Sequence, residues 1–246
     1  FGEFAHLVPG HSKAISSSGN SYIDDFESSE IPLDLKSFNS WTLSSIPRGQ
    51  DALFPEAVLN NDLTSGFNRA KLAWYVIDPL FLRNGSSTPD HIKKNPDEQS
   101  SHFVREVYEN EIFPNKESTT GIPTTLSVLN VAYYPEEKGP YNYDTDPGPF
   151  SKGMNPEGKL NDPESRWGGF MREVLTSDFE TANVQYIEFW LMDPFVESTD
   201  HNGGDLYINL GNVSEDILRD SRKSFEHGLP GTAEVRNVDT TAWGRV

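Results

Sequence analysis

Apolar and polar positions alternate along four segments of this chain, and a period of two is the pattern of a β-strand with one buried face. The four segments are residues 71–78, 126–134, 183–193 and 205–211. The third and fourth segments place on one side Ile187, Phe189, Leu191, Leu206, Ile208 and Leu210. We expect these six side chains to be buried together. Shorter strands are expected at residues 21–27, 41–43 and 166–174.

Helical spacing is confined to two segments. Apolar residues recur every three or four positions within residues 101–112, and this pattern stops before Pro114. A second helix is expected to begin near Ser214, because Asn212 and Glu215 resemble a capping pair.

The balance of these elements predicts the fold class. Strands outweigh helices, and long gaps rich in Gly and Pro separate them. This combination is typical of a mainly β chain, here a jelly-roll-like antiparallel β-sandwich with long loops and one or two short helices. Small polar residues at 16–21 indicate a linker. We therefore expect residues 1–20 to be an entry segment and linker, and residues 21–246 to form the β-sandwich module.

The charge of the chain limits the classes of partner that it is expected to bind. With 38 acidic and 20 basic residues, the formal net charge is -18. Such a surface repels phosphate backbones and anionic membranes, so nucleic-acid binding is not expected, whereas divalent cations and basic partners remain compatible. No apolar run approaches the length of a membrane-spanning helix, so direct membrane insertion of this segment is not expected. The absence of Cys excludes disulfides and thiolate metal sites.

One candidate metal site lies at the acidic opening Asp24, Asp25 and Glu27. A structural Ca²⁺ takes six to eight oxygen ligands, so other carboxylates would have to join. The candidates for that role are Asp144, Asp146 and Asp205. In the alternative interpretation, Asp24 and Asp25 are solvated or cap a turn. No EF-hand spacing occurs, and both interpretations stay open.

A candidate ligand or partner face follows from the third and fourth expected strands. The residues that alternate with the apolar set are Tyr186, Glu188, Trp190, Tyr207 and Asn209. Aromatic faces with hydrogen-bonding groups are what a sugar or peptide groove needs. In the alternative interpretation, loops or a larger assembly cover this face, and Glu188 pairs with Arg166 or Arg172.

Glycoside hydrolysis needs two carboxyl groups facing each other across a cleft. Glu188 and Asp193 lie five positions apart on one expected strand, so they point to opposite faces. The six His residues are scattered, without the spacing of a transition-metal site. No catalytic residue is therefore expected.

A stiff loop is expected from Lys138 to Gly158, which contains eight Gly and Pro residues. Proline fixes φ and lowers the entropy of the free loop. We expect Tyr141 and Tyr143 to anchor this loop, which can then line a conduit or dock on a partner. A surface excursion without a partner is the equal alternative.

Seven strings of residues carry a family signature together. They are SYIDDFE (21–27), EIFPN (111–115), YYPEEKGPYNYD (133–144), RWGGFMR (166–172), IEFWLMDPF (187–195), GGDLYINLGNVSEDIL (203–218) and RKSFEHGLP (222–230). In order and wording they resemble the SprA (Sov) family, the outer-membrane translocon of the Bacteroidetes type IX secretion system. The resemblance runs from about residue 21 to the end of the chain.

The resemblance implies a non-enzymatic structural and interaction module of a protein-export translocon that also serves gliding motility. The partners it implies are the translocon barrel, accessory secretion subunits and secreted protein cargo. The segment lacks the alternation of a lipid-facing barrel strand. We therefore expect a soluble part at the outer membrane, on the extracellular rather than the periplasmic side.

A vaguer likeness links the chain to carbohydrate-binding jelly rolls, which often open with a string like Asp24 to Glu27, followed by a strand bearing a Trp such as Trp41. The alternative function is therefore a carbohydrate-binding module at the cell surface, using the Tyr186, Trp190 and Tyr207 face. Fold analogy alone does not establish sugar binding.

Overall fold

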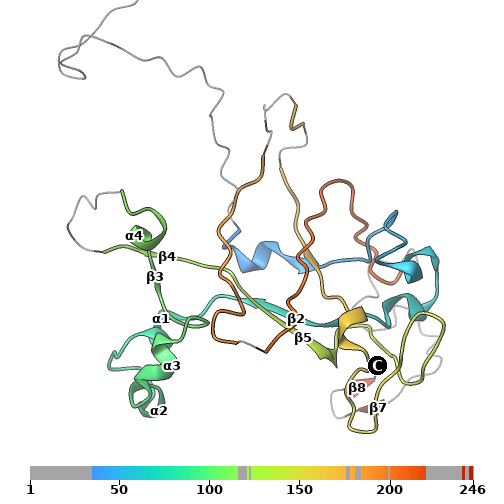
Figure 1. Cartoon of the computed structure of the whole chain (residues 1–246), viewed down its shortest axis with the longest axis horizontal. Helices are drawn as coiled ribbons and strands as arrows, with labels where there is room; N and C mark the ends of the chain where they lie inside the picture. Colours follow the sequence, from blue (N-terminus) through green and yellow to red (C-terminus); the bar gives the residue numbers. More distant parts are fainter. Residues whose placement is uncertain are drawn as a thin grey trace, which may run out of the picture. The chain divides into compact units, whose positions relative to one another are not determined.

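The structure is a computed structural model of the whole chain, and its cartoon is shown in Figure 1. It describes residues 35–115, 121, 123–175, 178–180, 184, 186–198, 200–219, 240, 241, 244 and 245. The chain divides into two compact units. The smaller is Phe1–Asp34 with Val174–Leu191, and the larger is Leu35–Glu173 with Met192–Val246. The strand expected at residues 21–27 and the boundary expected at residue 20 lie outside the described residues.

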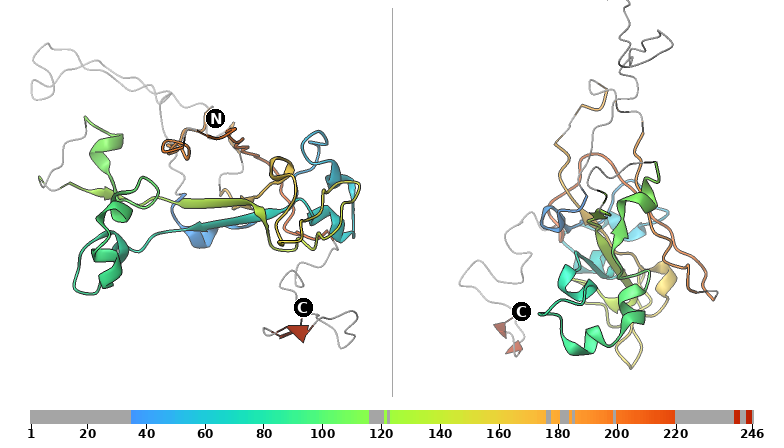
Figure 2. Two further views of the ribbon diagram at one scale, coloured as in Figure 1. Left: turned by 60° about the horizontal axis from the view of Figure 1, so that its bottom comes forward. Right: turned by 90° about the vertical axis from the view of Figure 1, so that its left-hand side faces the viewer.

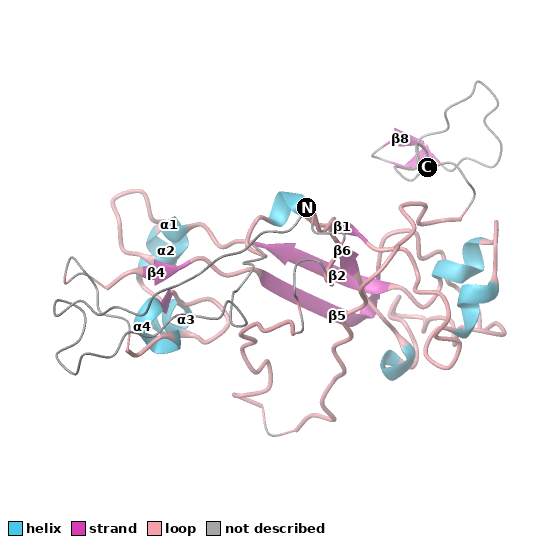
Figure 3. Cartoon of the chain, turned by 90° about the horizontal axis from the view of Figure 1, so that it is seen from above, coloured by secondary structure: helices cyan, strands magenta, loops and turns pink. Residues whose placement is uncertain are grey.

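Small antiparallel sheets and a few short helices make up the regular structure, and coil exceeds both (Figure 3). The strands are β1 (Thr42–Leu43), β2 (Ala70–Tyr75), β3 (Val107–Tyr108), β4 (Thr125–Leu126), β5 (Asn130–Lys138), β6 (Phe170–Met171), β7 (Thr240–Thr241) and β8 (Gly244–Arg245). The α-helices are α1 (Pro79–Leu82), α2 (Asp90–Lys93), α3 (Pro96–Ser100) and α4 (Glu109–Ile112). Short 3₁₀ turns are η1 (Phe38–Ser40), η2 (Pro55–Val58), η3 (Leu63–Gly66) and η4 (Pro163–Ser165).

The longest element is an antiparallel ribbon of β2 and β5, and it confirms two of the expected strands. Leu72 lies opposite Tyr133 and Trp74 lies opposite Val131. Residues directly opposite each other in an antiparallel pair share a face, so these four side chains form one face of the ribbon. Figure 2 shows the ribbon with short helices at one end and the long loop that follows β5 at the other.

A second, smaller strand pair lies against that face. β1 pairs with β6, which confirms the weaker strands expected at residues 41–43 and 166–174. The Phe170 ring stacks on Trp74 at 5.6 Å and meets the edge of Trp41 at 4.5 Å. Gly168 permits this approach, because a Cβ there would lie 3.0 Å from Leu72. Aromatic packing therefore joins the two strand pairs.

The apolar core beside these sheets is small. Ile46, Phe54 and Ala57 form a buried cluster, and Trp167 packs on it. The Phe54 and Trp167 rings meet edge to face at 5.6 Å. Many other buried groups in the described part are polar, including three ionisable side chains that are almost completely enclosed, Glu56, Arg69 and Asp144.

The helix expected over residues 101–112 is shorter than the pattern indicated. Its last turn, α4, is helical, whereas β3 occupies the two residues before it. The carboxylate of Glu111 accepts the backbone N–H of Tyr108 at 2.9 Å and pairs with Arg105 at 2.8 Å. These contacts, which lower the pKa of Glu111, cap the helix at Tyr108 and prevent its extension toward residue 101.

The strands expected over 183–193 and 205–211 are wrong for the described residues, which have no regular structure there. Their apolar set, expected to be buried, is instead exposed: Ile187, Phe189, Leu191, Leu206, Ile208 and Leu210. Alternation makes a segment able to pair in a sheet, but a strand forms only where a partner strand lies beside it. Gly203 and Gly211 also have positive φ, which bends the chain on both sides of the second segment.

The helix expected to begin near Ser214 is absent from residues 214–219, which are the described part of that segment. Arg219 itself has a φ of 54°, a left-handed conformation that a helix interior does not contain. The structure has four short α-helices in its described part instead of the one or two expected. None of them has the length and apolarity that a bilayer crossing requires.

Candidate functional site

Two of the signature strings meet at a buried ion pair. Arg166, from RWGGFMR, donates through Nη1 to Oδ2 of Asp144, from YYPEEKGPYNYD, at 3.1 Å. Both side chains are completely removed from solvent. The hydroxyl of Ser151 donates to the same carboxylate oxygen. A buried carboxylate is therefore held by a guanidinium and a hydroxyl, which offset the loss of its hydration.

The remaining donors of Arg166 bind backbone carbonyls. Nη2 reaches Gly153 at 2.9 Å and Asn161 at 2.8 Å, and Nε also reaches Asn161 at 2.9 Å. Nη1 contacts the carbonyl of Phe67 at 2.9 Å, just before β2. One planar guanidinium thus ties two places in the loop after β5 to the start of the ribbon.

Asn142 fixes the other side of the same loop. Its Nδ2 donates to the carbonyls of Phe67 at 2.7 Å and Arg69 at 2.6 Å. Its Oδ1 accepts the backbone N–H of Asp144 at 2.9 Å. Asn68 adds a bond from Nδ2 to the carbonyl of Phe150 at 2.8 Å. We call Asn68, Asn142, Asp144, Ser151 and Arg166 the loop lock.

A glycine at the end of β5 makes this arrangement sterically possible. A Cβ at Gly139 would lie 2.3 Å from the carbonyl oxygen of Ala70, well inside contact distance. The backbone N–H of Gly139 donates to the carbonyl of Arg69 across this short approach, at 3.1 Å. The chain therefore turns from β5 into the loop directly against β2.

The loop lock continues into a buried layer around Trp167. The guanidinium of Arg69 lies over the Trp167 ring, 4.5 Å from its centroid, and Nη1 donates to the carbonyl of Ser44 at 2.6 Å. The indole N–H of Trp167 donates to Glu56 Oε1 at 3.2 Å. This layer has the properties of a scaffold, because internal contacts engage each of these side chains.

The locked loop displays Tyr143. Asn142 and Asp144 are buried, whereas Tyr143 between them is 53% exposed. Tyr141 is half-buried with a φ of 62°. The contacts described above for this part of the loop come from Asn142, between the two tyrosines, and from Asp144, after Tyr143. Residues 141–144 lie in no strand, so a period-two pattern could not have assigned these contacts.

The expected aromatic face falls in two parts of the chain. Tyr186 and Trp190 are 80% and 72% exposed, and Glu188 is exposed; all three belong to the smaller unit. Glu188 was expected, in one interpretation, to pair with Arg166, but Arg166 binds Asp144 instead.

Tyr207 and Asn209 belong to the larger unit and are exposed there. The Tyr207 hydroxyl donates to Asp205 at 3.3 Å, and this nearby carboxylate raises the pKa of Tyr207. Asn209 Oδ1 accepts from Gln50 Nε2 at 2.6 Å. These two residues are accessible, and both already have partners of their own.

The metal candidates Asp24, Asp25 and Glu27 lie outside the described residues. Of the carboxylates expected to join them, Asp144 is committed to the loop lock, and Asp146 accepts the hydroxyl of Thr145 at 3.1 Å. Among the described residues no three His, Asp or Glu side chains gather in a way that suits a metal ion.

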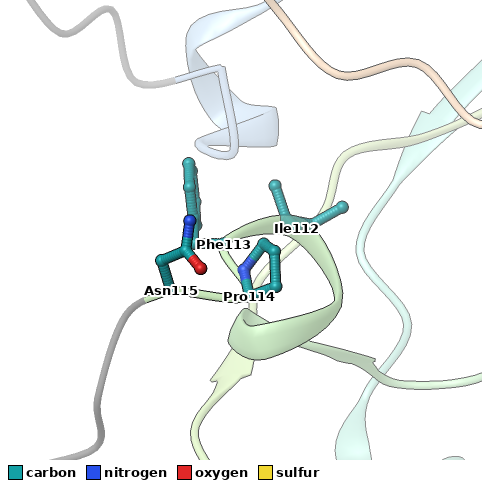
Figure 4. A pocket seen from close by; sticks show the side chains of 4 residues that line it. All are labelled: Ile112, Phe113, Pro114 and Asn115. Carbon is teal, nitrogen blue, oxygen red and sulfur yellow. The ribbon is translucent and has the colours of Figure 1, made fainter.

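One shallow pocket lies at the end of α4. It is lined by Ile112, Phe113, Pro114 and Asn115, which form most of the signature string EIFPN. Figure 4 shows that these four consecutive side chains surround an open hollow, with Asn115 as the polar member. A single short segment with one amide offers no converging set of polar groups, so this pocket lacks the character of a catalytic site.

Comparison of the chain with protein-family models and with curated proteins finds no match in either.

Proposed function

We propose that this chain is a non-enzymatic structural and interaction module of an outer-membrane protein-export translocon of the SprA type, serving type IX secretion and gliding motility. The resemblance of seven ordered strings supports this proposal. The contacts inside the larger unit add to it, because two of those strings meet at Asp144 and Arg166. Residues that carry the family signature thus have a physical task in holding the scaffold together.

The observation that carries the proposal is the loop lock with Tyr143 displayed on it. A loop fixed by a buried ion pair and by Asn142 loses little entropy when a partner binds. An exposed aromatic ring on a rigid loop is a favourable contact for a protein surface. The partners we propose are the translocon barrel, an accessory secretion subunit or passing cargo.

We also propose the finer fold, a jelly-roll-like β-sandwich. Support comes from the packing of the β1–β6 pair on one face of the β2–β5 ribbon through Trp41, Phe170 and Trp74. Two stacked antiparallel layers with an aromatic interior are the beginning of a sandwich. A location at the outer membrane, on the extracellular side, is part of the same proposal.

The test replaces Tyr143 by Ser within the full translocon of the native host. Tyr108→Ser is the matched control, because Tyr108 is also exposed and lies on β3, away from the loop. We expect secretion of cargo to fall in the Tyr143 variant and not in the control, at equal amounts of translocon in the outer membrane. Unchanged secretion in the Tyr143 variant would remove the contact role.

A second candidate function is glycan binding at the cell surface, and the exposure of Tyr186 and Trp190 favours it. Exposed aromatic rings stack on the apolar faces of sugars. Titration of the chain with a glycan array and with soluble oligosaccharides tests this function. A sugar that binds the native chain and not Trp190→Ala would support it, whereas no binding by the native chain would exclude it for the sugars used.

A further inference from the structure

Residues 202–219 form a strap without regular structure in the larger unit. Hydrogen bonds hold it at three separate places before its end. Asn202 donates to Glu164 at 3.3 Å, the side chain of Gln50 donates to Asn209 at 2.6 Å, and Ser45 donates to the carbonyl of residue 214 at 2.8 Å.

The strap ends at a buried arginine. Arg219 is 6% exposed, and its guanidinium enters a cradle of backbone carbonyls. Nη2 donates to Ile46 at 3.1 Å, and Nη1 donates to Leu59 at 3.2 Å and also to Ala57. The backbone N–H of Asn61 closes the arrangement by donating to the Arg219 carbonyl at 3.2 Å.

Favourable and unfavourable contributions to stability meet at Arg219. The hydrogen-bond acceptors of the guanidinium are neutral carbonyls, and its Nε is buried without an acceptor. Burial, followed by the charge of Arg48, lowers the pKa of Arg219. Its φ of 54° is strained for a residue with a side chain. A contact that combines strong bonds with desolvation and strain suits a latch that opens.

The strap contains a segment with the period-two pattern of a β-strand, but this segment lies in no sheet. Residues 205–211 alternate Leu206, Ile208 and Leu210 with polar or aromatic residues, and these three are 61%, 54% and 55% exposed. Exposure of three aliphatic side chains to water is unfavourable. Pairing with a strand edge would cover part of this surface and the backbone groups of the segment.

Among the described strands of the same unit, the β2–β5 ribbon has the length to receive this segment. In β2–β5 six residues of β2 are in register with β5, whereas β1–β6, β3–β4 and β7–β8 pair over two residues each. Within the described sheets neither β2 nor β5 has a second strand partner. The backbone N–H of Ala70 donates to the carbonyl of Trp167 at 2.8 Å, and the carbonyl of Glu136 accepts the N–H of Leu160 at 2.8 Å. A third strand would therefore add beside residues 71–75 or 130–134. The alternating core of the segment, residues 206–210, is therefore no longer than the ribbon.

We propose that Arg219 is a latch that keeps the strap open, and that its release lets residues 205–211 add as a third strand to an edge of the β2–β5 ribbon. The latched state is the one described above. The released state converts a two-stranded ribbon, which is weak alone, into a three-stranded sheet. This device is independent of the proposed function.

Hydrogen exchange on the full chain tests the latch with Arg219→Ala. The matched control is Arg48→Ala, which removes a neighbouring exposed arginine that donates to Asn60. In the native chain and the control we expect fast exchange of the amides of residues 206–210. In Arg219→Ala we expect these amides, and those of one ribbon strand at 71–75 or 130–134, to slow by about tenfold or more.

A second measurement tests whether movement of the strap causes the slower exchange. Because the chain has no Cys, Gln50→Cys with Asn209→Cys can be joined by a short bismaleimide, which should prevent the slowing caused by Arg219→Ala. If Arg219→Ala does not fold, Arg219→Lys replaces it, with a weaker effect in the same direction. Slow exchange of residues 206–210 in the native chain, or unchanged fast exchange in every folded variant, overturns the proposal.

Discussion

Asp144 and Arg166 are the two residues on which the larger unit depends most directly. Each is buried, and each has the other as its charge partner. Removing one member of such a pair leaves an uncompensated charge away from water, which is more damaging than the loss of a surface pair. Loss of either member should therefore weaken the loop lock strongly.

Asp144→Ala should lower the free energy of unfolding by about 3–5 kcal/mol, because Arg166 would remain buried without a counter-charge. The control is Lys71→Ala, which breaks the exposed pair between Lys71 and Glu137 and should lower the free energy of unfolding far less, because water screens that pair. Urea unfolding measures both. Similar losses in the two variants would contradict the role given to Asp144.

Tyr133 links the ribbon to the loop lock, because its hydroxyl donates to the carbonyl of Arg166 at 2.6 Å. Burial raises the pKa of Tyr133 to about 12, against the opposing charge of Arg166. The folded state therefore binds the phenol proton more tightly than the unfolded state does. The stability that this provides is complete below pH 10, the ordinary value, and is lost as the pH rises toward 12.

The prediction concerns the difference between the native chain and Tyr133→Phe. The decrease in unfolding free energy between about pH 9.5 and about pH 11.5 should be smaller in the variant, because the variant has no phenol to ionise at this position. Denaturant unfolding at several pH values measures it. Parallel pH curves for the two proteins would show that Tyr133 ionises alike in both states.

At the scale of elements, glycines determine how closely strands and loops approach. Gly139 brings the end of β5 onto β2, and Gly168 lets the segment before β6 lie on the ribbon. Both belong to strings that carry the family resemblance. The short distance alone, without that resemblance, requires a residue without a side chain at Gly139, whereas at Gly168 a Cβ would fit only if Leu72 or Tyr133 moved.

Gly139→Ala should lower the free energy of unfolding by about 1–3 kcal/mol, the range for forcing extra atoms into a packed place. The added Cβ would meet backbone, which cannot rotate away. Gly148→Ala is the control in the same loop, because nothing lies within 4 Å of the place that its Cβ would take, and it should change stability by less than about 0.5 kcal/mol. Thermal unfolding of both variants checks the difference.

Sequence patterns predicted the elements that find a partner nearby in space. The expected strand at 71–78 became β2, and that at 126–134 became much of β5 and part of β4. Residues 187–191 and 206–210 have equally good alternation, but period two states only that a segment can pair. Whether a partner strand is present depends on contacts far apart in the chain, which no local pattern contains.

The candidate site was predictable to a similar extent. Gly and Pro residues indicated a stiff loop, and Tyr143 is displayed on it. The loop lock was missed because Asp and Arg are usually exposed, and their burial becomes acceptable only through a partner 22 positions away. Asp144, named as one of three carboxylates that could join a cation site, pairs with Arg166 instead.

At the scale of the whole molecule, the net charge of the chain and its buried contacts have different roles. The formal net charge is -18, yet the buried polar contacts of the larger unit include two arginines enclosed among carbonyls, and one of these arginines pairs with an aspartate. Guanidinium groups suit this task because they donate in several directions at once and stay charged. The acidic surface is thus left to govern encounters with partners, where basic proteins are favoured over acidic ones.

The span of the Arg166 contacts has a consequence for how the chain is made. Arg166 binds the carbonyl of Phe67, 99 positions earlier. During synthesis the first half of the larger unit would emerge without the side chain that locks it. Contacts of such long range slow folding and delay it until most of the unit is available. A polypeptide with this property would stay unfolded for longer after its synthesis, and would expose its apolar segments during that time.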